Sequence, residues 1–143
     1  MKRFFAILAL ALMPFMAQAE GMMHRVAIHV DENDPQLMNM ALNNAQNVAA
    51  YYASVGDEVE IELVAYGPGL NMFVEGKSPV ADRLSALTLE LPKLTLSACG
   101  NTHAAMKKKA GGDVPLLSDV GVVPSGVVRL IELQEQGFAY IRP

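Results

Sequence analysis

Residues 25–65 read RVAIHVDENDPQLMNMALNNAQNVAAYYASVGDEVEIELVA, and this segment indicates a strand, a helix and a second strand. After the first β-branched run, Asp34 offers an N-cap and Pro35 stands where proline is favoured, at the first helical position. Apolar residues then recur at helical spacing up to Tyr52, and Gly56 ends the predicted helix. The segment therefore predicts the repeating unit of an α/β fold.

The second strand of this unit, Glu58–Ala65, alternates apolar and acidic side chains. Its apolar residues would share one face of the sheet, and Glu58, Glu60 and Glu62 would share the other. Such alternation is typical of a strand with one face in solvent, so we expect it at or near the edge of the sheet.

The rest of the chain continues the alternation of strands and helices, after a turn and short helical pieces between residues 66 and 89. The remaining elements are expected at Leu94–Ala98 (strand), 101–110 (helix), Val120–Val123 (strand), Ser125–Gln136 (helix) and Phe138–Ile141 (strand). The sequence thus predicts a three-layer α/β/α fold with a mostly parallel five-stranded sheet, as a single domain at residues 20–143. Parallel sheets of this kind carry their sites at the carboxyl ends of the strands, which selects the loops after Val30, Ala65 and Ala98.

The composition excludes several classes of protein. The 143 residues are 52% hydrophobic and 18% charged, which provides enough apolar material for a core and argues against disorder. A net charge of −4 without a long basic stretch argues against nucleic acid as a partner. The single cysteine excludes an internal disulfide and any site that needs several thiolates. The chain contains neither a dinucleotide fingerprint nor a P-loop, and we expect no cofactor.

Residues 1–19 have the pattern of a bacterial signal peptide. Lys2 and Arg3 precede an apolar run, and residues 17–19 read Ala-Gln-Ala, the small residues that signal peptidase requires. Pro14 interrupts the run, which falls short of the roughly 20 apolar residues that span a bilayer. We expect cleavage after Ala19, a periplasmic location and no stable membrane anchor.

Cys99 is the most informative residue of the sequence. It lies where the third predicted strand gives way to a helix, and both the backbone N–H groups and the dipole of a helix N-terminus lower the pKa of a thiol. Gly100 beside it would let another group approach the sulfur closely. The alternative is a buried structural cysteine, because free cysteines often fill space in a core. Its position at the strand-to-helix loop favours the reactive thiol.

Two histidines could share a site with Cys99. His103 follows it by four residues and would be a catalytic partner for the thiolate if the helix includes Cys99; an exposed helix histidine is the alternative. His29, near the carboxyl end of the first strand, could reach the same cleft or could be a core histidine with satisfied hydrogen bonds. Candidate binding residues, which could equally be turn or capping residues, are Gly67, Pro68, Gly69, Gly100, Asn101 and Thr102.

A copper site is a weaker alternative. Thioether and imidazole groups suit copper(I), and the chain offers several of both. The candidates are Met22, Met23, His24, Met38, Met40 and Met72. Their spacing does not indicate a dedicated site, so we predict no metal ligand.

Three segments together resemble the DsrE/DsrF-like family. They are residues 64–70, VAYGPGL; residues 98–102, ACGNT; and the ending at 123–143, with VPSGVV and LQEQGFAYIRP. The likeness covers nearly all of the chain after residue 19. The resemblance implies a five-stranded α/β/α domain and homo-oligomers, commonly trimers or hexamers. In the sulfur-relay members it also implies a cysteine that carries sulfur as a persulfide, and Cys99 matches the place of that cysteine after the third strand.

These observations predict a periplasmic sulfur carrier or persulfide-handling protein with Cys99 as its nucleophile, a carrier more than a turnover enzyme. Its partners would be thiol or persulfide proteins that donate and accept sulfur. A homo-oligomer is also expected, because the apolar arc of the last helix is wider than one sheet-facing stripe; it comprises Val127, Val128, Leu130, Ile131 and Leu133. The alternative is a non-catalytic oligomeric binding module in which Cys99 is buried.

Overall fold

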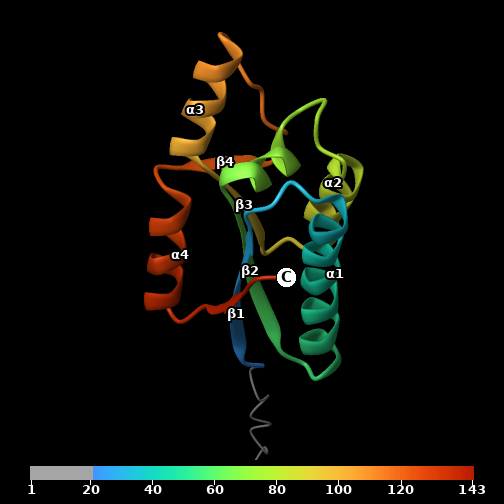
Figure 1. The fold of residues 1–143 in the computed structure, drawn as a ribbon. Helices are drawn as coiled ribbons and strands as arrows, with labels where there is room; N and C mark the ends of the chain where they lie inside the picture. The colour runs from blue at the N-terminus through green and yellow to red at the C-terminus, as the bar shows by residue number, and fades with distance from the viewer. Residues whose placement is uncertain (1–20) are drawn as a thin grey trace, which may run out of the picture.

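Five parallel strands form the centre of the structure (Figure 1). The computed structural model describes residues 21–143, so the predicted signal peptide lies outside the described residues. The strands are β1 (Met23–Val30), β2 (Glu58–Ala65), β3 (Leu94–Cys99), β4 (Val120–Val123) and β5 (Ala139–Ile141), in the order β4-β3-β2-β1-β5. The predicted fold class is confirmed, and every strand pair is parallel.

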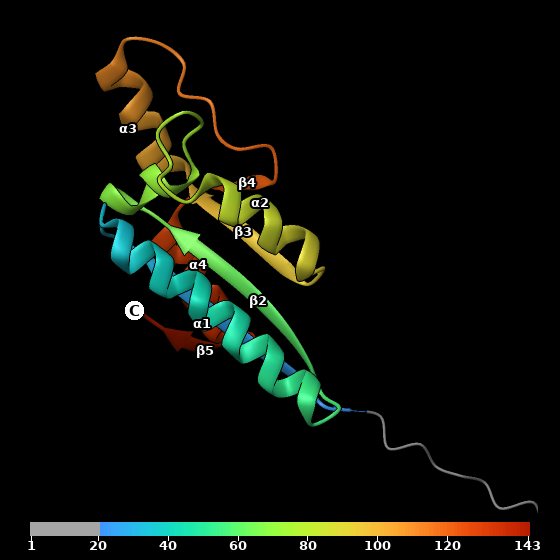
Figure 2. The ribbon, with the colours of Figure 1, turned by 90° about the vertical axis from the view of Figure 1, so that its right-hand side faces the viewer.

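The helices form one layer on each face of this sheet (Figures 1 and 2). Helices α1 (Pro35–Ser54) and α2 (Ala81–Glu90) cover one face, and α4 (Gly126–Glu135) covers the other. Crossovers between parallel strands are right-handed. The chain steps in one direction from β1 to β4 and returns in the other direction to β5, so α4 must lie on the face opposite α1 and α2.

Two further helices extend beyond the carboxyl edge of the sheet. The 3-10 helix η1 (Gly67–Phe73) follows β2, and α3 (Gly100–Ala110) follows β3 and projects away from the sheet (Figure 1). None of the residues of α3 is buried. No helix between residues 21 and 143 is long and apolar enough to cross a membrane.

Local signals set the bounds of α1 as the sequence predicts. The side chain of Asp34 accepts a hydrogen bond of 2.8 Å from the backbone N–H of Gln36, and Pro35 occupies the first helical position. Gly56, just after the helix, has a φ of +83°, a conformation that glycine adopts without strain.

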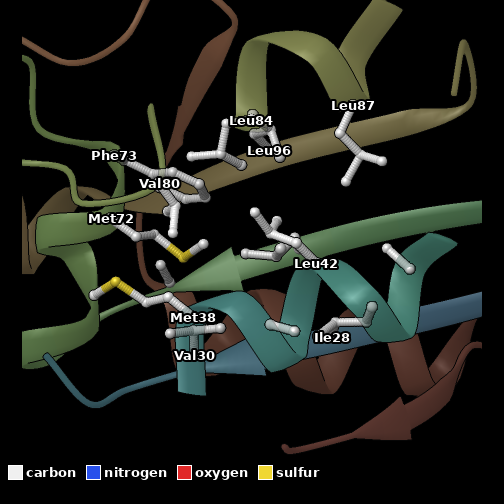
Figure 3. Close-up of a cluster of buried hydrophobic side chains, with 14 of the residues drawn as sticks. Ile28, Val30, Met38, Leu42, Met72, Phe73, Val80, Leu84, Leu87 and Leu96 are labelled. Atoms are coloured by element: carbon white, nitrogen blue, oxygen red, sulfur yellow. The ribbon is translucent and has the colours of Figure 1, made fainter. Parts of the chain in front are cut away.

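The larger core lies between the sheet and the layer of α1 and α2 (Figure 3). Met38 and Leu42 of α1 meet Met72 and Phe73 of η1 there, and all four side chains are fully buried. The thioethers of Met38 and Met72 therefore fill core space, which removes two of the ligands that the copper alternative requires.

The prediction that β2 lies at or near the edge of the sheet is wrong, because β2 is the central strand. This strand pairs with β1 on one side and β3 on the other, and Glu62 is only 4% exposed. Its carboxylate accepts two hydrogen bonds of 2.7 Å from Arg129 of α4 and one of 2.6 Å from the hydroxyl of Ser97. Because the buried charge is paired and hydrogen-bonded, an acidic residue can occupy an interior face of the sheet.

Candidate functional site

The carboxyl ends of β1, β2 and β3 place three of the site's side chains on the face of the sheet that α4 covers. Strand side chains alternate between the two faces, and Ala27 and Val64 pack against α4. His29 follows Ala27 on that face, and Tyr66 follows Val64 and packs against the same cluster. Cys99 lies on it too, since Ala98 belongs to the core of the opposite face. The topology thus brings together the three loops selected from the sequence.

Cys99 lies at the N-termini of two helices. It is the last residue of β3 and the N-cap of α3, and it also meets Gly126, the first residue of α4. Its side chain is 5% exposed. The backbone N–H groups of Gly126, Thr102 and Asn101 and the hydroxyl of Thr102 surround the sulfur and lower the pKa of the thiol, although Cys99 forms no side-chain capping hydrogen bond with α3. Helix N-termini carry unpaired N–H groups and partial positive charge, so this arrangement favours a thiolate.

The pKa of the Cys99 thiol reflects two opposing effects. Burial is the largest single influence and raises the pKa, because desolvation disfavours the charged form. The hydrogen bonds from Gly126, Thr102 and Asn101 lower the pKa and together outweigh burial. The net pKa lies below the ordinary value for cysteine, in the direction that the sequence predicts.

Thr102 connects the thiol to the turn after β2. Its Oγ1 accepts a hydrogen bond of 3.0 Å from the backbone N–H of Gly67, which leaves the hydroxyl proton for the sulfur of Cys99. Gly67 has a φ of +54°, in the left-handed region that favours glycine. Asn101 contributes its backbone N–H to the sulfur, and its side chain is exposed.

The other predicted binding glycines serve close packing. A Cβ at Gly69 would lie 2.4 Å from the carbonyl oxygen of Val30, and one at Gly100 would lie 2.9 Å from that of Val123. These two residues let η1 and α3 approach the strand ends, and the approach leaves no room for a ligand at these points. Pro68 is exposed and lines a pocket between η1 and α3, which Cys99 does not line.

Gly126 is a site residue that the sequence reasoning missed. A Cβ there would lie 3.1 Å from the Cβ atoms of both Cys99 and Tyr66, so glycine lets the N-terminus of α4 reach the sulfur. The signal was present in the sequence. In a parallel sheet every helix that follows a strand begins at the carboxyl edge, so Pro124-Ser125-Gly126 after the fourth strand had to lie near Cys99.

His29 belongs to an aromatic cluster beside the thiol. Its Nδ1 lies 2.7 Å from the hydroxyl of Tyr140, and its ring centroid lies 4.5 Å from that of Tyr66. The side chain is 4% exposed, and Nε2 has no hydrogen-bond partner among the described residues. Burial lowers the pKa of the imidazole; Asp31 opposes this effect and Arg142 adds to it. The ring is therefore held in its neutral form, with one of its two nitrogens satisfied.

The imidazole of His103 is engaged by the loop after α3. Its Nε2 lies 2.7 Å from the carbonyl oxygen of Val114 in the loop after α3, so the ring donates a hydrogen bond there. His103 is not among the groups that shift the pKa of the Cys99 thiol. Although α3 begins right after Cys99, the imidazole ties α3 to the following loop.

An ion pair between Arg142 and Asp31 connects the C-terminal segment to the residue that follows β1. Its guanidinium donates hydrogen bonds of 3.1 Å to both carboxylate oxygens of Asp31. Neither residue, nor Tyr140, is among the residues predicted for the site. β5 lies beside β1, and this placement sets all three close to His29.

The copper alternative loses His24 as a free ligand, in addition to the two buried methionines. No group of three or more His, Cys, Asp or Glu side chains between residues 21 and 143 could hold a metal ion. His24 is engaged elsewhere: its Nε2 lies 2.9 Å from Asp57, and its ring stacks on Tyr52 at 3.6 Å between centroids.

Among solved structures, the chain is similar to the protein of unknown function MTH1491 from Methanobacterium thermoautotrophicum. The two share 36% sequence identity with a TM-score of 0.71, and the match covers 84% of this chain and 99% of that one. The chain belongs to the family of MTH1491. Models of known protein families gave no match, and neither did curated proteins. Membership of the MTH1491 family supports the fold of nearly the whole described chain, and the function must be inferred from the site.

Proposed function

We propose that this protein is a sulfur carrier or persulfide-handling protein of the DsrE/DsrF-like type, with Cys99 as the residue that bears the sulfur. The observation that carries the proposal is the position of this thiol at two helix N-termini, where hydrogen bonds lower its pKa despite burial. Two segments that resemble the family, residues 64–70 and 98–102, supply Tyr66 and Gly67 and the run from Cys99 to Thr102.

The proposed chemistry is thiol–persulfide exchange. The Cys99 thiolate attacks the outer sulfur of a donor persulfide; a new S–S bond forms, the donor's S–S bond breaks, and the donor leaves as a thiolate with the electron pair. In the second step an acceptor thiolate attacks the outer sulfur of the Cys99 persulfide, and Cys99 leaves as a thiolate. Neither step requires an oxidant, a reductant or a cofactor.

The donors around Cys99 suit both steps. An attacking thiol must be deprotonated, and a leaving thiol departs faster when its pKa is low. The N–H of Gly126 and the hydroxyl of Thr102 favour the thiolate in each case. Because His29 is neutral, it places no positive charge near the thiolate, and backbone and hydroxyl dipoles set the reactivity of the thiol.

The proposal includes export to the periplasm, protein partners that donate and accept sulfur through thiols, and a homo-oligomer.

The apolar arc of α4 supports the homo-oligomer. Leu130 and Leu133 are buried against the sheet, whereas Val127, Val128 and Ile131 are about half exposed on the outer face of the helix. If this face joins two copies, Ile131→Glu will lower the mass measured by sedimentation at micromolar concentration, and a monomeric parent protein will contradict the oligomer.

A second candidate function is a binding module in which Cys99 is structural. The 5% exposure of Cys99 supports it, because a sulfur carrier must be reached by its partners. The two candidates differ in whether the native thiol reacts.

Loading with sulfur tests the proposal. The purified protein is incubated with sodium polysulfide, and its mass is measured under native and denaturing alkylation. We expect the mass of one added sulfur atom in the parent protein and none in Cys99→Ser. If the native protein takes up no sulfur and Cys99 is alkylated only after denaturation, the sulfur-carrier function is excluded and the binding module is supported.

A further inference from the structure

A pocket of about 580 Å³ is lined by residues of η1 and α3 and of the segments that follow them. Figure 1 shows these two helices beyond the carboxyl edge of the sheet. Small-molecule sites commonly have volumes of roughly 300–1,000 Å³. Thr102 lines the pocket and also lies beside Cys99, where its hydroxyl lowers the pKa of the thiol, but Cys99 itself is not part of the lining. The pocket is therefore a separate cavity that adjoins the thiol site.

Hydrogen bonds hold the walls of this pocket in place. The bond from the N–H of Gly67 to Thr102 joins η1 to α3. The bond from His103 to the carbonyl of Val114 joins α3 to the loop that follows it. That loop is also bonded to the last residue of η1, since the N–H of Leu117 donates a hydrogen bond of 2.9 Å to the carbonyl oxygen of Phe73. These hydrogen bonds fix η1, α3 and the following loop relative to one another. His103 contributes one of them, which is a structural role for this residue.

The charges that line the pocket are all of one sign. Lys77 and Lys109 are part of the lining, and no acidic residue is. Neither lysine forms an ion pair with another residue in the described range, whereas neighbouring Lys107 pairs with Asp113 at 2.8 Å. Acidic residues outnumber basic ones by 15 to 11 in the chain, so its net charge is negative. The lining of this pocket, with two free ammonium groups and no carboxylate, carries the opposite sign.

The remaining lining is mostly apolar. Val114 is buried at the wall, and Pro68 and Met106 contribute further apolar surface. Asn71 and Thr102 supply the polar groups that could fix the orientation of a ligand. Apolar walls with a few polar groups and unpaired cations suit a molecule with an apolar body and an anionic group.

We propose that this pocket binds a small organic anion, whose carboxylate or sulfonate group lies between Lys77 and Lys109 and whose apolar part lies on Pro68, Met106 and Val114. This site goes beyond the sulfur-carrier function and does not depend on it. A ligand bound there contacts Thr102 and so lies one side chain away from Cys99.

A matched pair of dyes tests the proposal with the full chain. Anilinonaphthalene sulfonate has an anionic group on an apolar body, and N-phenylnaphthylamine has the same body without the charge. We expect the sulfonate to bind with enhanced fluorescence. Lys77→Met together with Lys109→Met should weaken sulfonate binding about five- to tenfold and leave binding of the neutral dye unchanged, because only the charge is removed.

Two further variants locate the dye. Ala105→Phe, at an exposed lining position of α3, should abolish binding of both dyes by filling the cavity, and Lys108→Met, which removes a neighbouring lysine outside the lining, should change neither. The exposed apolar face of α4 could also attract these dyes. Binding that survives the pocket variants, or that is lost in Val128→Ser with Ile131→Ser, would overturn the proposal.

Discussion

The backbone N–H of Gly67 donates a hydrogen bond of 3.0 Å to the hydroxyl oxygen of Thr102, 35 residues further along the chain. Because the oxygen of Thr102 accepts this bond, the hydroxyl proton of Thr102 is free to point toward the sulfur of Cys99, where it lowers the pKa of the thiol. The turn after β2 therefore acts on the thiol through one intermediate side chain, and the effect of Thr102 can be measured as a change in thiol reactivity.

Thr102→Val should slow alkylation of native Cys99 at neutral pH by about tenfold, because a hydrogen bond to a charged acceptor contributes roughly 1.5 kcal/mol or more. The pKa of the thiol should rise, since the lost hydroxyl favours the thiolate. The measurement is the pH dependence of iodoacetamide alkylation. Thr102→Ser keeps the hydroxyl and should react like the parent protein. Equal rates in all three proteins would mean that the hydroxyl does not act on the sulfur.

Gly126→Ala should destabilise the fold by about 1–3 kcal/mol, the usual cost of overpacking. The new Cβ would lie 3.1 Å from the Cβ atoms of Cys99 and Tyr66, so α4 must move away and its N–H must retreat from the sulfur. We therefore also expect slower alkylation of Cys99. Chemical denaturation gives the stability. Gly112→Ala, where an added Cβ meets nothing within 4 Å, is the control and should change neither quantity.

The elements that are predictable from the sequence depend on local signals. Helix α1 (Pro35–Ser54) and the place of Cys99 at a strand-to-helix junction follow from periodicity, capping and turn residues. The burial of Glu62 could not be predicted, because its alternation is that of an exposed face and its partner Arg129 lies 67 residues away. No local signal specifies that pairing.

The aromatic cluster at the site was unpredictable for a similar reason. Tyr140 reaches His29 across 111 residues because β5 returns to lie beside β1, and strand order is not encoded in the periodicity of any one segment. The contact made by His103 was unpredictable for a different reason. Its spacing from Cys99 fits a contact within one helical turn, but the carbonyl of Val114 outside the helix binds the ring instead.

Arg129→Met should destabilise the protein by about 3–5 kcal/mol, because it leaves the carboxylate of Glu62 buried without its partner. The side chain of Glu62 is 6% exposed, and that of Arg129 is 27% exposed. Adding Glu62→Gln to the first change should recover part of the loss, since it removes the unpaired charge. Arg25→Met breaks an exposed pair with Glu60 and an exposed hydrogen bond of 3.4 Å to the carbonyl oxygen of Gln136, and it should cost about 1 kcal/mol or less. Denaturant titration that gives similar losses for Arg129→Met and Arg25→Met would contradict this account.

The buried imidazole of His29 should make the stability depend on pH in mildly acidic solution. Burial lowers its pKa in the folded chain below the ordinary value of 6.5, so the unfolded chain takes up the proton first as the pH falls. The free energy of unfolding should then decrease as the pH drops through about 6.5 and on toward the folded pKa, and be fully retained above 6.5. Denaturant titrations between neutral and mildly acidic pH measure this slope. His29→Asn should flatten it, whereas Tyr140→Phe, which removes only the partner of Nδ1, should lower stability by about 1 kcal/mol and keep the slope. An unchanged slope in His29→Asn would assign the pH dependence to other groups and show that the imidazole is not held neutral by burial.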